Sequence, residues 1–102
     1  MKWMSRWMKP GETVDVEALR NQLQAEGFDV YQWKGAPGAA YLNYIHANDE
    51  VVCVLSGEAE AKIENHTGQV QSGDRLDIPA NTYHSLTVTS DEPLVVLTGF
   101  RH

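Results

Sequence analysis

Cysteine and positive charge are both scarce in this sequence. Its 102 residues contain one cysteine, Cys53, so no internal disulfide can form, and we expect a protein of the reducing cytoplasm. Lys and Arg number 8 against 14 Asp and Glu, which gives a formal net charge of −6. Because nucleic-acid-binding surfaces need clustered positive charge, this balance predicts no nucleic-acid partner.

Long hydrophobic runs are also missing. No apolar run approaches the roughly 20 residues of a membrane-spanning helix, so we expect no membrane association. Lys9 and Pro10 interrupt the basic start of the chain before any apolar signal-peptide core. With 42% hydrophobic and 22% charged residues, the composition is that of a folded protein, and the length suits one domain.

One short helix is predicted near the N-terminus, over residues 15–26. Asp15 is a suitable N-cap residue, and Gly27 suits the position that follows a helix. The apolar residues recur at three and four positions: Val16, Leu19 and Leu23. This narrow stripe predicts a helix that docks onto a larger body.

From Phe28 onward, short β-prone segments alternate with turn residues. The eight candidate strands are Asp29–Trp33, Ala39–Ile45, Val51–Leu55, Glu58–Glu64, Gln69–Gln71, Arg75–Ile78, Ser85–Thr89 and Leu94–Phe100. Such strands without intervening helices are typical of an antiparallel sandwich or barrel. We therefore expect an all-β barrel over 31–102, preceded by an N-terminal extension over 1–30 that is not an independent domain.

Four histidines are present, and two of them have an unremarkable explanation. His66 lies in an expected hairpin tip and His102 is the last residue, so both are predicted at the solvated surface. His46 and His84 instead adjoin predicted strands with apolar residues on the same face, which makes them candidates for a functional site.

Strand alternation places these two histidines near a carboxylate. Leu42, Tyr44 and His46 are expected to share one face, and Glu50 continues that inner face if the intervening turn preserves the phase. His84 begins a matching stripe on a later strand. Two imidazoles and one carboxylate are then expected to converge inside the barrel.

A carboxylate buried among aliphatic side chains is costly unless it is paired. A divalent cation held by His46, Glu50 and His84 is the most economical partner, and this donor set suits Zn, Mn, Fe or Ni. The alternative from the residues alone is a hydrogen-bonded Glu–His cluster that holds no metal.

Two spaced motifs raise the case for a metal. The chain reads Gly38-x5-Tyr44-x-His46-x3-Glu50-x6-Gly57 and then Gly73-x5-Pro79-x-Asn81-x2-His84-x3-Val88. In this the sequence resembles the cupin superfamily, whose motifs are G-x5-H-x-H-x3,4-E-x6-G and G-x5-P-x-G-x2-H-x3-N. The resemblance implies a cupin-like double-stranded β-helix, a jelly-roll barrel, with His46, Glu50 and His84 as metal ligands, one fewer than the usual four.

Three positions depart from the family pattern. Tyr44 stands where the family usually has its first metal-binding histidine, and a neutral phenol is a poor ligand. We expect Tyr44 to hydrogen-bond a metal-bound water, gate the site or donate a proton; the alternatives are a cavity filler and a direct ligand. Asn81 replaces a glycine but tolerates a left-handed backbone. Val88 replaces an asparagine and is expected to add core volume.

The segment after Glu50 is apolar on its outer face as well. Val51, Cys53 and Leu55 need cover, which the predicted helix, the N-terminal tryptophans or a second subunit can supply. From the family resemblance we expect a homodimer in which Trp3 and Trp7 take part. Cys53 itself is expected to be inert packing rather than a nucleophile.

Two functional classes stay open. The first is a small metal-dependent enzyme acting on a small polar molecule. The second is a non-catalytic module that binds a sugar-like or acidic metabolite beside a degenerate or empty metal site. Fold alone does not choose between them.

The aromatic residues expected at the mouth or edge of the barrel are Tyr31, Trp33 and Tyr41.

Overall fold

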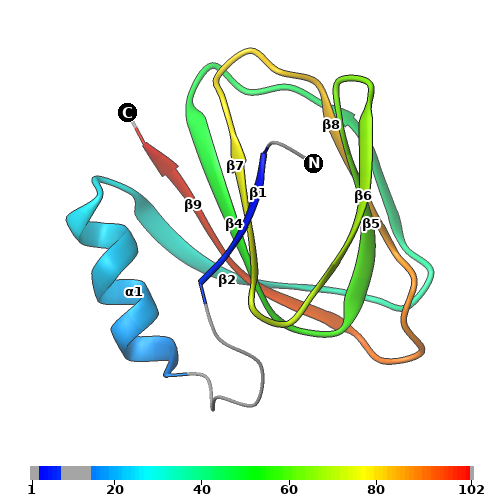
Figure 1. Ribbon diagram of the computed structural model, residues 1–102, viewed down its shortest axis with the longest axis horizontal. Helices are drawn as coiled ribbons and strands as arrows, with labels where there is room; N and C mark the ends of the chain where they lie inside the picture. The colour runs from blue at the N-terminus through cyan, green and yellow to red at the C-terminus, as the bar shows by residue number, and fades with distance from the viewer. Residues whose placement is uncertain (1–2, 8–14, 102) are drawn as a thin grey trace.

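A computed structural model describes residues 3–7 and 15–101, which form two antiparallel sheets and one helix (Figure 1). His102, and the interruption predicted at Lys9 and Pro10, lie outside the described residues. The elements are β1 (Met4–Arg6), α1 (Val16–Ala25), β2 (Asp29–Gly35), β3 (Ala40–Tyr44), β4 (Asp49–Ser56), β5 (Glu58–Ile63), β6 (His66–Gln71), β7 (Asp74–Ile78), β8 (His84–Val88) and β9 (Leu94–Arg101).

The two sheets face each other across one apolar core. Their strand orders are β1-β7-β4-β9-β2 and β3-β8-β5-β6, and every pairing is antiparallel. Buried side chains from both sheets, among them Val54, Leu76 and Val88, form the core between them. The predicted all-β jelly-roll architecture is confirmed.

Most strand ends differ from the prediction by one or two residues, and two larger differences stand out. Met4–Arg6 forms the additional strand β1, which pairs with β7, although its sequence shows no alternation. Pairing with an existing edge fixes this segment more strongly than its own pattern does. Strand β6 begins at His66 rather than at residue 69, and the exposed His66 pairs with Ile63 beside a tight turn.

The helix begins and ends as the sequence predicts. The Asp15 carboxylate accepts a hydrogen bond from the Ala18 N–H at 3.0 Å, and Gly27 follows the helix with φ 96°. Leu19 and Leu23 are buried. In the described ranges, no helix combines the length and apolarity needed to cross a membrane.

The outer face of β4 is covered by the chain itself. Helix α1 lies outside the two sheets, on the side of β2 and β9 (Figure 1). Its leucines pack with Val51, Cys53 and Leu97, and Trp7 packs against the same cluster. Trp7 also donates a hydrogen bond from Nε1 to the Asp74 carbonyl at 3.1 Å. Two of the covers expected for this face, the helix and the N-terminal segment, therefore both contact it.

Strand β3 contains an irregularity that sets the orientation of its side chains. The inward orientation predicted for Leu42 is wrong, because its side chain is 60% exposed. The register shifts between Tyr41 and Tyr44, and Asn43 adopts φ 58° while its N–H donates to Ser85 Oγ at 2.9 Å. This bulge interrupts the alternation, so Tyr41 and Tyr44 both line the interior.

Two loops that carry the motifs are tied together. Asn81 has φ 60°, the left-handed conformation expected of it, and its N–H donates to the His46 carbonyl at 2.7 Å. The neighbouring Ala80 N–H donates to the Asp49 carboxylate at 2.9 Å. These bonds fix the loop before β4 against the loop that leads to β8.

Candidate metal centre

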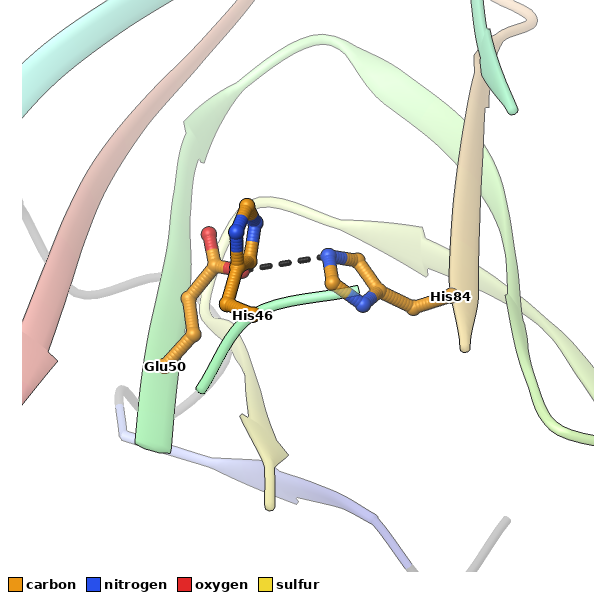
Figure 2. A group of neighbouring side chains, drawn as sticks. All are labelled: His46, Glu50 and His84. Carbon is orange, nitrogen blue, oxygen red and sulfur yellow. Dashed lines mark ion pairs between the residues drawn. The ribbon is translucent and has the colours of Figure 1, made fainter. Parts of the chain in front are cut away.

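The three side chains predicted to converge meet at one point (Figure 2). His46 extends from the loop after β3, Glu50 from β4 and His84 from the first position of β8. One donor atom from each residue lies within 4.8 Å of the others. One strand from each sheet and the loop that joins β3 to β4 thus bring together residues up to 38 positions apart in the sequence.

Glu50 is the centre of this group. Its Oε1 lies 3.2 Å from His84 Nε2 and 3.6 Å from His46 Nε2, while Oε2 accepts a hydrogen bond from the Thr98 hydroxyl at 2.9 Å. The Glu50 side chain is only 12% exposed. Among the described residues, no donor meets the buried Oε1 with hydrogen-bond geometry. A buried carboxylate oxygen facing two imidazole nitrogens fits a bound cation.

The backbone orients His84 toward this point. Its Nδ1 lies 3.1 Å from the Thr82 carbonyl, which can only accept, so Nδ1 carries the hydrogen and Nε2 faces Glu50. Burial lowers the pKa of His84, but the contact with Glu50, the Thr82 carbonyl and the charge of Glu50 together raise the pKa above its usual value. The protonated form of His84 is therefore favoured when no metal is bound.

Aromatic rings surround the two imidazoles. The Phe100 ring meets His46 edge-on with centroids 5.1 Å apart, and the Tyr44 centroid lies 6.4 Å from those of both His46 and His84. Tyr44 is 47% exposed, so it stands on the solvent side of the group. This place is consistent with the gating or positioning role expected for it, which stays a prediction.

A cavity of about 370 Å³ opens beside the three residues. It is lined by Trp33, Tyr41, Tyr44, His46, Glu50, Val52, His84, Leu86, Val96, Thr98 and Phe100. Of the aromatic residues expected at the mouth or edge, Trp33 and Tyr41 line this cavity, whereas Tyr31 is exposed on β2.

Sequence reasoning missed two residues of the site, Thr98 and Phe100. Both belong to β9, where Val96, Thr98 and Phe100 alternate toward the cavity. The sequence did offer one signal for them: Thr98 is the single polar residue among Val96, Thr98 and Phe100, which share one face of the strand. Cys53, by contrast, takes no part: it is fully buried on the other face of β4, and burial raises the pKa of its thiol to about 12.

The chain belongs to the cupin family, because the family model described as the Cupin domain matches residues 32–100. Both motifs and all three candidate ligands lie inside the matched range. No curated protein matches the chain.

Solved structures share the fold. A structure of DMSP lyases is 26% identical with a TM-score of 0.68, over 74% of this chain and 38% of that one. A Cupin 2 conserved barrel domain protein from Salinispora arenicola is 18% identical with a TM-score of 0.67, over 97% of this chain and 74% of that one. Oxalate decarboxylase from Lactobacillus farciminis, as a formate complex, is 24% identical with a TM-score of 0.67, over 74% of this chain and 24% of that one. The chain thus spans much less than the full length of the two enzymes.

Proposed function

We propose that this cupin binds a divalent metal ion, one of Zn, Mn, Fe or Ni, through His46, Glu50 and His84, and that it acts as a metal-dependent enzyme on a small polar molecule. The observation that carries the proposal is the buried Oε1 of Glu50, which faces both Nε2 atoms without a hydrogen bond from the described residues. Resemblance to a lyase and a decarboxylase supports chemistry on small molecules but does not identify the substrate.

The residues around the group have separate tasks in this proposal. A bound metal would supply Lewis acidity, and three protein ligands leave coordination positions for a substrate. Thr98 and the Thr82 carbonyl hold Glu50 and His84 in orientation. Tyr44, at the solvent side, is placed to position a substrate or donate a proton.

Metal analysis tests the proposal directly. The purified protein should contain a divalent metal, and after chelation its melting temperature should rise when Zn, Mn, Fe or Ni is added. Glu50→Gln should abolish this rise, whereas Glu60→Gln, on the exposed side of β5, should preserve it. If native protein holds no metal and none of the four ions changes its melting temperature, the proposal is wrong.

A non-catalytic binding module is the second candidate. The 3.2 Å contact between Glu50 Oε1 and His84 Nε2 favours it, since a protonated His84 offsets the negative charge of the carboxylate without a metal. The absence of a histidine at Tyr44 points the same way. In that case small molecules, and not metal ions, should raise the melting temperature of chelated protein.

The homodimer is a separate proposal. The homodimer was expected partly because the outer face of β4 is apolar, and this face is covered by α1 and Trp7 of the same chain. A dimer would therefore use another surface. Light scattering at micromolar concentration tests it, and a monomeric mass contradicts it.

A further inference from the structure

The side chains that line the cavity change from ionisable to apolar along the direction of the strands. Strand register places Glu50 beside Phe100, then Val52 beside Thr98, then Val54 beside Val96. In the opposite sheet, Tyr44 lies beside His84 and Tyr41 beside Leu86. In both sheets these pairs run from a charged end to an apolar end.

The apolar end has aromatic and aliphatic walls. Trp33, in register with Val96, meets Tyr41 edge to face with centroids 4.7 Å apart. Leu86 lies on the same face of β8 as His84, two residues further along the strand. Among the described residues that line the cavity, none is Arg, Lys, Asn or Gln.

Few polar groups in the walls are available to a ligand. The Thr98 hydroxyl lies 2.9 Å from Glu50 Oε2 and 3.1 Å from the Val51 carbonyl, so its hydrogen is already engaged. Val52, Leu86 and Val96 offer no hydrogen bond to the hydroxyls of a sugar or to the second charge of a dicarboxylate, and the only donors among the wall residues at that end are the Trp33 indole N–H and the Tyr41 hydroxyl. The walls therefore disfavour sugar-like ligands and acidic ligands that carry more than one charge.

We propose that the ligand is a compact ring compound with an apolar body and a single oxygen-bearing head group. The head lies at His46, Glu50 and His84, and the ring lies between the wall of Trp33 and Tyr41 and the side chain of Leu86. The place of the head rests on the proposed metal function, whereas the body is selected by the cavity walls. A volume of about 370 Å³ is at the small end of ligand pockets, which favours a compact body.

Binding of matched probes tests this assignment. Phenol and benzoate carry one ring and one oxygen-bearing head; glucose and succinate carry many hydroxyls or two charges. By calorimetry, metal-loaded protein should bind phenol or benzoate at least about tenfold more tightly than glucose and succinate. Equal or tighter binding of glucose or succinate overturns the proposal.

A variant pair locates the ring. Leu86→Trp fills the apolar end and should weaken phenol and benzoate binding at least about tenfold while metal uptake is retained. Thr87→Trp, on the other face of β8, should leave binding unchanged. If Leu86→Trp does not fold, nuclear Overhauser contacts between phenol protons and the Leu86 and Val96 methyl groups in the unmodified protein provide the same information, and their absence overturns the proposal.

The same measurements separate this inference from the proposed function. Phenol binding that Leu86→Trp blocks in protein that takes up no metal supports the ring assignment and contradicts the metal proposal. Metal uptake without phenol or benzoate binding supports the metal proposal and overturns the ring assignment.

Discussion

Thr98 holds the carboxylate of Glu50 from the neighbouring strand. Its Oγ1 lies 2.9 Å from Oε2, which leaves Oε1 directed at His46 and His84. The bond therefore links β9 to the group supplied by β4, β8 and the loop after β3. Thr98 is therefore a positioning residue: it orients Glu50, the carboxylate proposed to bind the metal.

Replacing this hydroxyl should weaken metal binding. Thr98→Val keeps the shape of the side chain but frees Oε2, so the carboxylate loses its fixed orientation, and partners of metal ligands are typically worth about 10–100-fold in affinity. Competition with a chromophoric chelator measures the effect. Thr67→Val, on the exposed edge strand β6, is the control. Identical affinities for the two variants would contradict the role of Thr98.

Tyr44→His should strengthen metal binding by about tenfold or more, because it restores an imidazole at the position where the family usually has one. Tyr44→Phe separates the roles of the phenol. If Tyr44 only gates or positions, Tyr44→Phe keeps the metal affinity of the unmodified protein and changes ligand binding or turnover. A loss of metal affinity in Tyr44→Phe, measured by the same competition, would show direct ligation instead.

The raised pKa of His84 gives opposite pH trends with and without metal. Folding favours protonated His84, so this stabilisation of metal-free protein is complete below the usual histidine pKa of 6.5 and is lost as pH rises through the raised value. Metal needs a deprotonated Nε2, so metal stabilisation grows over the same interval. Melting temperatures in chelator and in Zn, from pH ~6 to ~8.5, test both trends. A Glu50→Gln variant in chelator should show a flatter profile; an unchanged profile would exclude Glu50 as the cause.

Helix α1 should contribute measurably to stability through one side chain. Leu23 is fully buried against the outer face of β4 and β9, so Leu23→Ala should lower the free energy of unfolding by about 2–5 kcal/mol. Urea denaturation measures the change. Gln24→Ala, exposed on the same helix, should change it little. A Leu23→Ala effect as small as that of Gln24→Ala would mean that α1 is only loosely docked.

Local sequence patterns determined much of the fold. Asp15 and Gly27 marked the helix ends, and the turn residues marked most strand boundaries. The convergence of His46, Glu50 and His84 followed from alternation combined with the spacing of two motifs. The helix ends and turns depend on near neighbours in the chain, and alternation depends on a period of two. The meeting of three residues from distant segments was supported in addition by the resemblance to the cupin motifs.

The missed features depend on partners distant in sequence. Strand β1 exists because β7 offers an unpaired edge, and nothing within Met4–Arg6 indicates that edge. The bulge at Asn43 reverses the orientation of Leu42, and strict alternation cannot anticipate an inserted residue. Thr98 belongs to the site only because β9 pairs with β4.

The buried thiol of Cys53 can report local opening of helix α1 or unfolding of the barrel. It is the chain's single cysteine, it lies beneath α1, and with a pKa of about 12 it is almost wholly unreactive while covered. A thiol reagent therefore modifies only molecules in which the helix has lifted or the barrel has unfolded. The labelling rate then reports how often that happens, without any engineered probe.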